Sequence, residues 1–143
     1  MRRRTQRQDA IRTIVRRDRV RTQRDLVELL KVEGFGCTQA TVSRDITEMG
    51  LRKLPEGLYV LAEDLHLQRM VSDLVLSVLR SGTLVLVKAA AGTAPGVAAA
   101  LDAADFEDVL GSIAGDDTIL IICSSDDQAE SLVDRIDRFR GRR

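Results

Sequence analysis

The segment that decides the fold of the N-terminal part runs from Thr38 to Gly50 and reads TQATVSRDITEMG. Thr38 is a residue type that caps helix N-termini, and Gly50 is the type that commonly follows a helix C-terminus. Between them Val42, Ile46 and Met49 are spaced at i, i+4 and i+7, so they share one apolar face. The segment therefore predicts an amphipathic helix.

Two further helices are predicted upstream of this segment. Apolar residues recur at helical spacing from Arg7 to Arg17, with arginines on the remaining faces. A second helix starts after Thr22, because Thr22 and Asp25 match the capping-box pattern, and it ends near Gly34. Its predicted buried stripe consists of Leu26, Val27, Leu29 and Leu30.

A hairpin is predicted downstream. Two short apolar stretches, 51–54 and 58–61, flank a Pro-Glu-Gly sequence that has turn chemistry. Three helices followed by a hairpin define a winged helix-turn-helix domain, which we place at residues 1–61. The next stretch shows no clear hydrophobic period, so residues 62–70 are predicted to be a linker.

Residues 71–143 are predicted to form a second domain with the element order ββαββα, a two-layer α+β fold. The predicted strands are 72–80, 83–89, 109–113 and 118–123, and the predicted helices are 94–104 and 126–139. Ser81 and Gly82 have the composition of a tight turn between the first two strands. A helix that ends at Arg80 is the competing interpretation of the first strand.

The two parts of the chain carry opposite charge. The 143 residues contain 22 basic and 22 acidic side chains, but the first 55 residues contain 14 basic and 7 acidic ones. The remaining 88 residues contain 8 basic and 15 acidic side chains, so the zero net charge is a cancellation. This split indicates two modules with different partners, of which the basic one suits a polyanion.

The composition excludes several classes of function. His66 is the only histidine, which disfavours histidine metal clusters and histidine-dependent catalytic triads. Cys37 and Cys123 are far apart in sequence and suit a reducing cytoplasm, and no apolar run approaches the ~20 residues of a membrane span. We expect a cytoplasmic protein that is not an enzyme, with no catalytic residue, no metal ligand and no membrane partner.

The exposed side of the helix at 38–50 is predicted to read DNA. Gln39, Ser43 and Thr47 form a row at i, i+4 and i+8, with Arg44 beside them. Gln and Arg pair bidentately with adenine and guanine, and Ser or Thr can contact bases or phosphates. Taken alone, Arg44 is also explained by an ion pair with Glu48. Ten arginines among the first 24 residues supply attraction to DNA and favour the DNA-reading interpretation.

The second signal is the segment GSIAGDDTILIIC, Gly111 to Cys123, which places Asp116 and Asp117 on a turn between apolar strands. Turn chemistry alone explains such a pair. A divalent metal would need a third ligand, and none stands at an obvious spacing. A guanidinium group is the other partner that matches adjacent carboxylates, because its planar donors bind carboxylate oxygens bidentately.

Both domains resemble the bacterial arginine repressor family. In the N-terminal domain the resemblance rests on RTQRDLVELL, residues 21–30, and TQATVSRDI, residues 38–46. It implies that Ser43 and Arg44 lie at the DNA, with Gln39 and Thr41 as weaker candidates.

In the C-terminal domain the family motif reads GTIAGDDT, so Ser112 replaces the usual Thr. The resemblance implies that Asp116 and Asp117 bind the effector L-arginine and that Asp102 binds its amino end.

One stretch departs from the family pattern. Where the family has Pro-Gly, then Asn or Ala, then Ala-Gln, this chain has Ala91 followed by Gly92, Thr93, Ala94 and Pro95. Gly92, Thr93 and Ala94 remain candidate effector contacts. The Gln amide is lost at Pro95, and either Thr93 or a water could compensate for it.

The resemblance further implies a hexamer built from two trimers, held by the C-terminal domains, with L-arginine as co-repressor bound between the trimers and no other cofactor. We expect a regulator that binds operator DNA and represses arginine biosynthesis genes, with activation of arginine catabolism as a further role. Arginine would favour the hexamer that presents several winged helices to paired half-sites.

Two rival functions remain open on the sequence. One is a winged-helix DNA-binding protein whose C-terminal domain only oligomerises, with a lost or altered effector site at Pro95. The other is a metal-dependent enzyme that uses Asp116 and Asp117, which the shortage of further ligands disfavours.

Overall fold

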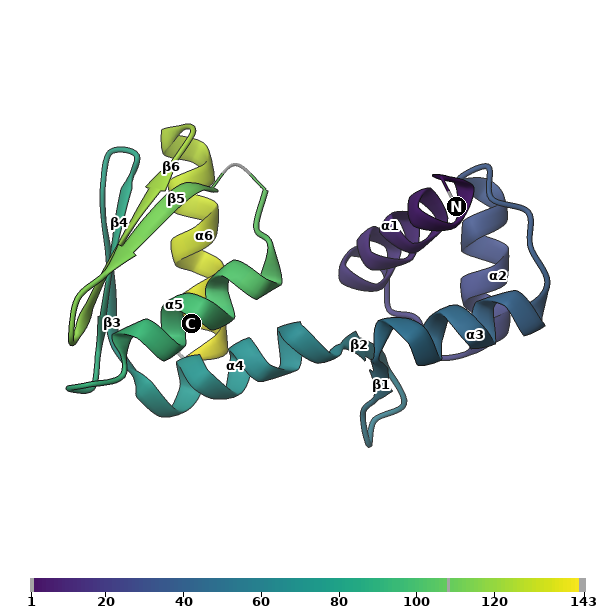
Figure 1. The fold of residues 1–143 in the computed structure, drawn as a ribbon, viewed down its shortest axis with the longest axis horizontal. Coiled ribbons are helices and arrows are strands. Elements are labelled where there is room, and N and C mark those ends of the chain that lie inside the picture. Colours follow the sequence, from purple (N-terminus) through teal and green to yellow (C-terminus); the bar gives the residue numbers. More distant parts are fainter. Residues whose placement is uncertain (1, 108, 142–143) are drawn as a thin grey trace. The chain divides into compact units, whose positions relative to one another are not determined.

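The computed structural model describes residues 2–107 and 109–141. The chain divides into two compact units, residues 1–62 and 63–143, and each unit has a hydrophobic core of its own. Figure 1 labels the helices and strands of both units.

The N-terminal unit consists of three helices and a two-stranded sheet. Its elements are α1 (Arg2–Arg17), α2 (Gln23–Val32), α3 (Gln39–Met49), β1 (Leu51–Lys53) and β2 (Tyr59–Leu61). The fully buried side chains that join them are Ile11, Ile14, Val20, Leu26, Leu30, Val42 and Leu61. This arrangement confirms the winged helix-turn-helix prediction. The first helix starts at Arg2, five residues earlier than predicted, because arginine is a good helix former and nothing interrupts the helix there.

The helix ends in this unit follow the local signals in the sequence. The Thr22 side chain accepts a hydrogen bond from the Asp25 amide, and the Asp25 carboxylate accepts one from the Thr22 amide, which completes the capping box. Thr38 caps α3 in the same way through the Thr41 amide. Gly50 ends α3 with φ of 69°, a left-handed conformation that favours glycine.

The stretch predicted as a linker is helical. Residues 62–70 form most of α4 (Ala62–Leu74), and the helix also includes residues 72–74, which the sequence assigned to a strand. The physical reason is a stripe at helical spacing, Leu67, Met70, Val71 and Leu74, which packs into the core of the C-terminal unit. The predicted boundary cut through this stripe, so neither half showed a period.

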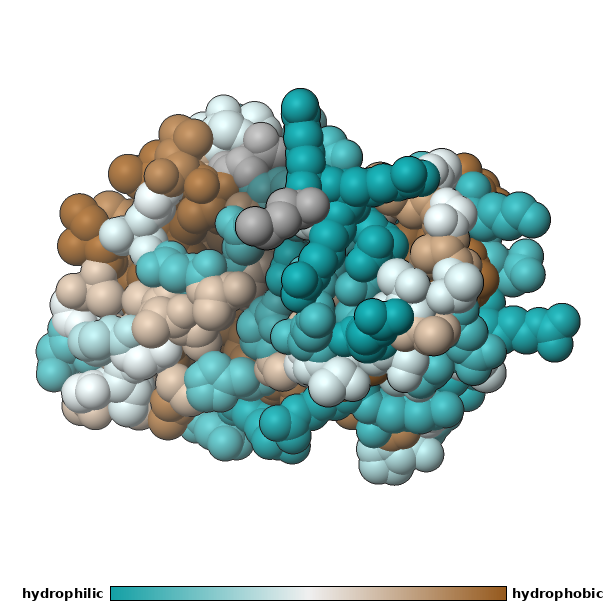
Figure 2. Space-filling view, turned by 45° about the vertical axis from the view of Figure 1, so that its right-hand side comes forward, coloured by the Kyte–Doolittle hydropathy of each residue, from teal (hydrophilic) through white to brown (hydrophobic). Residues whose placement is uncertain are grey.

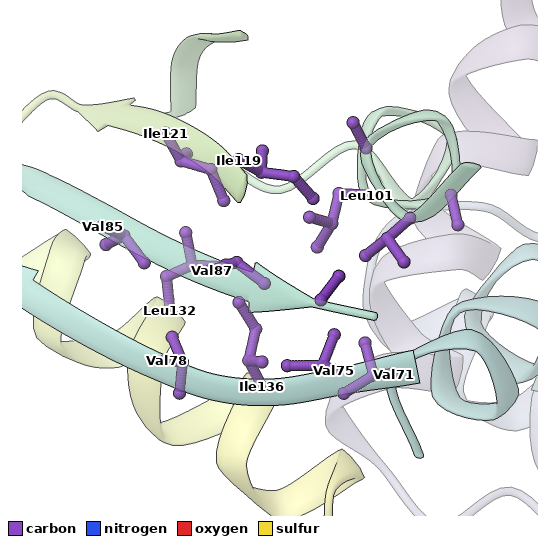
Figure 3. Close-up of a cluster of buried hydrophobic side chains, with 14 of the residues drawn as sticks. Val71, Val75, Val78, Val85, Val87, Leu101, Ile119, Ile121, Leu132 and Ile136 are labelled. Atoms are coloured by element: carbon purple, nitrogen blue, oxygen red, sulfur yellow. The ribbon is translucent and has the colours of Figure 1, made fainter. Parts of the chain in front are cut away.

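The C-terminal unit places helices on one face of a four-stranded antiparallel sheet. After α4 follow β3 (Val75–Ser81), β4 (Leu84–Ala89), α5 (Ala94–Ala104), β5 (Val109–Ala114), β6 (Thr118–Cys123) and α6 (Asp126–Phe139). The strand order is β3-β4-β6-β5. Val85, Val87, Ile119 and Ile121 of the central strands point toward Leu132, Ile136 and Leu101 of the helices (Figure 3). The ββαββα prediction is confirmed, and residues 75–81 are a strand rather than the end of a helix.

The opposite face of this sheet is open. Large hydrophobic side chains remain exposed along its strands, and hydrophobic surface gathers on this unit in Figure 2. They are Leu76, Leu79, Leu84, Leu110, Ile113 and Ile122. Exposed apolar patches of this kind mark sites of interaction with other proteins, with membranes or with apolar ligands. Among the described residues, none of the helices combines the length and apolar character that a membrane crossing needs.

Candidate functional sites

The surface of α3 presents the side chains that the sequence predicts there. Gln39, Arg44 and Thr47 are exposed, and Ser43 is half-buried between them. Thr41 is also half-buried, and its hydroxyl lies 3.1 Å from the hydroxyl of the N-cap residue. The structure therefore places the predicted polar side chains on one helix, with Gln39, Arg44 and Thr47 open to solvent.

Arg44 does not pair with Glu48, the internal partner that the sequence left open. Glu48 instead accepts hydrogen bonds from Arg4 and Gln8 of α1. Within the part of the chain that the structure describes, no hydrogen bond or ion pair holds the Arg44 side chain. Its guanidinium is therefore available to an external partner.

Asp45 is a buried acid that the sequence reasoning missed. It is only 1% exposed. Its carboxylate accepts two hydrogen bonds from the Arg7 guanidinium, at 2.6 and 3.0 Å, and one from the Gln8 amide at 3.1 Å. These bonds fix α3 against α1. The sequence contained a signal for this burial, because Asp45 adjoins Ile46 on the inner side of the helix. A buried acid at such a position requires a cation as its partner.

The ion pair also fixes the charge state of Asp45. Burial alone raises the pKa of a carboxyl group, but the hydrogen bonds from Arg7 and Gln8 and the positive charge of Arg7 outweigh it, so the pKa of Asp45 is lowered. The hydrogen bond to Asp45 correspondingly raises the pKa of Arg7. Asp45 is therefore ionised at neutral pH, and α3 is held by a charged pair.

The hairpin adds further basic groups. Arg52 and Lys53 of β1 are exposed, and the Lys53 ammonium lies 5.3 Å from the centre of the Tyr59 ring. The Tyr59 amide donates to the Val20 carbonyl at 2.9 Å, which fastens β2 to the segment between α1 and α2. The wing thus presents two cations from an anchored strand pair.

In the C-terminal unit, the turn between β5 and β6 is fastened to the loop before α5. Asp116 accepts a hydrogen bond from the Gly92 amide through its side chain at 3.1 Å, and from the Ala94 amide through its carbonyl at 3.1 Å. The Asp117 carbonyl accepts from the Ala89 amide at 2.8 Å. The structure therefore brings the Asp pair together with two of the three predicted loop residues.

Asp117 has a freer side chain than Asp116. One carboxylate oxygen, Oδ1, accepts a hydrogen bond from the Thr118 hydroxyl at 2.8 Å, and the Lys88 ammonium donates to that same hydroxyl at 2.7 Å. Both aspartates are exposed, and in residues 2–107 and 109–141 neither forms an ion pair. The pair therefore presents two exposed carboxylates that form no ion pair with another described residue.

Asp102 lies in a different hollow. It is exposed at the end of α5 and lines a pocket together with Phe106, Gly111 and Ser112. No contact joins it to Asp116 or Asp117 in the described part of the chain. The pocket that Asp102 lines therefore includes neither Asp116 nor Asp117.

The departure at Pro95 is accommodated by the start of α5. Pro95 occupies the first turn of the helix, where a missing amide costs no helical hydrogen bond, and its side chain is exposed. The Thr93 hydroxyl donates to the Ala90 carbonyl at 2.6 Å. The Thr93 hydroxyl proton is therefore already engaged within its own loop.

The acidic side chains do not form a metal centre within the described residues, where no three His, Cys, Asp or Glu side chains lie close enough to hold an ion. Their chemistry instead suits hydrogen-bond donors that carry positive charge.

Together the two units define a class of protein, a transcription regulator with a winged-helix DNA-binding domain and a separate α+β domain. Residues 2–67 match the family model described as "Arginine repressor, DNA binding domain", and residues 71–138 match "Arginine repressor, C-terminal domain".

Relatives match almost the whole chain. The arginine repressor of Carboxydothermus hydrogenoformans is 42% identical, in a match that covers 93% of this chain and 96% of the relative. That of Thermus thermophilus is 44% identical, in a match that covers 90% of this chain and 85% of the relative. That of Shouchella clausii is 39% identical, covering 91% and 94%. The chain belongs to the arginine repressor family, whose members are arginine-responsive DNA-binding regulators of transcription.

Proposed function

We propose that this protein binds operator DNA through α3 and the wing, and that it represses arginine biosynthesis genes when L-arginine is bound. A further activation of arginine catabolism fits the same binding reaction. The observation that carries the proposal is the presence, in one chain, of an exposed Arg44 on α3 and an exposed Asp116–Asp117 turn, none of which forms an ion pair with another described residue. Because the partner is chromosomal DNA, we place the protein in the cytoplasm.

The DNA-binding half rests on α3. Gln39 and Arg44 are the side chains whose donors and acceptors match base edges, and Ser43 and Thr41 suit a base edge or a phosphate. Arg52 and Lys53 of the wing supply charge beside the duplex. The buried Arg7–Asp45 pair orients α3 for this contact.

The effector half rests on the turn. The guanidinium of L-arginine would bind the free oxygens of Asp116 and Asp117, with Gly92, Thr93 and Ala94 forming the loop against them. Asp102 would bind the amino group of the ligand. Because the pocket that Asp102 lines does not include Asp116 or Asp117, we propose that an arginine bound by all three is shared between two copies of the chain.

The open face of the sheet supports this assembly. We propose that it is covered by other copies, in a hexamer of two trimers with arginine between them. Arginine binding would then favour the hexamer, and the hexamer would present several α3 helices to paired half-sites.

The central experiment is a fluorescence-anisotropy titration of a labelled duplex from the region upstream of an arginine biosynthesis gene of the same genome. It is run with and without L-arginine, and with a mixed-sequence duplex of equal length as the control. We expect L-arginine to tighten binding to the upstream duplex. We also expect it to increase the ratio of the affinity for this duplex to the affinity for the mixed-sequence duplex. An affinity that is identical with and without arginine would contradict the proposed role of arginine as effector. Equal affinity for both duplexes would contradict sequence-specific binding to the operator.

Arg44→Ala should weaken binding to the operator duplex by ~1 to 3 kcal/mol and reduce the preference over the mixed-sequence duplex, if Arg44 reads a base. Lys31→Ala is the matched control, because it also removes one exposed cation from the same unit but lies on α2. If the two substitutions change the sequence preference equally, Arg44 does not read a base and only adds to the general electrostatic attraction to DNA.

Ile113→Asp should break the assembly without unfolding the unit. Ile113 is 70% exposed on the open sheet face, so the change costs little in a single copy, whereas a carboxylate buried between copies is unfavourable. Sedimentation equilibrium should show smaller species. Val32→Asp is the matched control, since Val32 is 83% exposed but lies on α2; it should leave the assembly intact.

A further inference from the structure

A small hollow lies where the first turn of α1 meets α3. Its lining contains Arg4, Arg7, Thr41, Arg44, Asp45 and Glu48. The hollow borders the exposed face of α3, because Arg44 belongs to both. Any duplex that contacts Arg44 therefore brings its backbone close to this hollow.

Two of these residues are fully engaged with each other. Arg7 donates twice to Asp45, and Asp45 uses its second oxygen to accept from Gln8 as well. The side chains of Arg7 and Asp45 are 17% and 2% exposed. They form the fixed floor of the hollow, and their charges cancel.

The remaining charges are exposed and exchangeable. A single carboxylate oxygen of Glu48, Oε2, accepts hydrogen bonds from both the Arg4 guanidinium and the Gln8 amide, the latter at 3.1 Å. The side chains of Arg4 and Glu48 are 55% and 43% exposed. Exposed ion pairs of this kind are weak, so an external anion can replace the carboxylate at little cost.

We propose that this hollow seats one phosphate of the DNA backbone, and that the Glu48 carboxylate occupies the place of that phosphate in the free protein. Arg4 and Gln8 already converge on one anionic oxygen, and the half-buried Thr41 adds a hydroxyl on the same wall. A phosphate oxygen accepts from these groups as a carboxylate does. Glu48 must then turn outward, where its charge repels the duplex.

This inference rests on the proposed DNA-binding function and deepens it. Glu48 becomes an internal competitor that lowers DNA affinity without reading sequence. Its contribution is therefore the same on operator and mixed-sequence DNA, unlike that of a base-reading residue.

The test is a titration of the full chain with a mixed-sequence duplex over a series of salt concentrations. Glu48→Gln should bind about fivefold more tightly at low salt, because one repulsive charge near a phosphate is removed. Arg4→Gln should bind more weakly and reduce the slope of log affinity against log salt by about 1. The matched controls are Glu28→Gln and Lys31→Gln, which make the same charge changes on α2, outside the hollow.

The outcomes separate this inference from the proposed function. If the native chain binds no duplex, the DNA-binding function fails. In a second outcome the native chain binds, Glu48→Gln has the same affinity as Glu28→Gln, and Arg4→Gln has the same affinity and salt dependence as Lys31→Gln. That result would overturn the proposed phosphate site in the hollow and leave the DNA-binding function standing. Tighter binding by Glu48→Gln cannot arise from misfolding, so the gain is the decisive result.

Discussion

Asp117→Ala is expected to abolish the effect of L-arginine on operator binding. A guanidinium that binds a carboxylate pair bidentately loses charge-assisted hydrogen bonds when one carboxylate is removed, and we expect the arginine dissociation constant to rise by roughly 100-fold. Affinity for DNA in the absence of arginine should stay at the native value. Isothermal titration measures the first quantity, and the anisotropy titration measures the second.

Asp117 is the better target of the two aspartates. The Asp116 side chain accepts a hydrogen bond from the Gly92 amide, so its removal would also loosen the loop before α5. The side chain of Asp117 bonds only to the hydroxyl of Thr118 among the described residues. Glu130→Ala is the control, because it removes an exposed acid from α6 of the same unit. A native response to arginine in Asp117→Ala would contradict the proposed site.

Most of the fold follows from local sequence signals. Thr22, Thr38 and Gly50 define helix ends through contacts within a few residues, and α5, β6 and α6 have the bounds that the sequence predicts. The alternation of more and less buried residues along β4 and β6 likewise follows from the strand geometry, in which successive side chains point to opposite faces of the sheet. Such features need no knowledge of tertiary contacts.

The prediction failed where stability comes from packing between distant segments. The helix α4 buries Leu67 and Val71 in a core made by strands and helices that follow it, and its weak local pattern was taken as a linker. Tertiary packing commonly overrides weak local preference in this way.

In the candidate sites, too, some features follow from the local sequence and others depend on contacts between distant segments. The sequence pattern was sufficient to predict that Gln39, Arg44, Asp116 and Asp117 are exposed, and the chemistry assigned to them stays a prediction. The partners of Asp45 and Glu48 were not predictable, because Arg4, Arg7 and Gln8 lie 37 to 44 residues away in the sequence. The pocket that Asp102 lines also required the structure, since spacing along the chain does not show which residues line one pocket.

Arg7→Met is expected to destabilise the N-terminal unit by roughly 3 kcal/mol at neutral pH. The substitution keeps much of the side-chain volume but leaves the Asp45 carboxylate buried without its cation, and such uncompensated charges are strongly unfavourable. A unit of this size has a total stability of only about 3 to 9 kcal/mol, so a large fraction should unfold on mild heating. Tyr59 is the only tyrosine, and the chain has no tryptophan, so tyrosine fluorescence reports on this unit alone.

The pH dependence distinguishes a lost charge pair from lost packing. In the native chain the pKa of Asp45 is lowered from its unfolded value of about 3.9, so the pair stabilises fully above that value. This contribution is lost as pH falls through the lowered pKa. In Arg7→Met, burial without the cation raises the pKa of Asp45, so its cost is greatest at neutral pH and disappears when acid protonates the carboxyl group. The stability difference between the two proteins should therefore begin to shrink above about pH 4, as acid protonates the carboxyl group of the variant, and should shrink further below about pH 4, as the native pair loses its charge.

The variant Asp45→Asn provides the matched comparison for this pair. It keeps an oxygen that can accept from Gln8, and it leaves Arg7 with a 17% exposed side chain that water can reach, so its cost should be smaller than that of Arg7→Met. Combining the two substitutions should recover part of the stability lost in Arg7→Met, because no buried carboxylate remains. If Arg7→Met costs the same at pH 3 as at pH 7, or if the double variant is less stable than Arg7→Met, the pair acts through packing and not through charge.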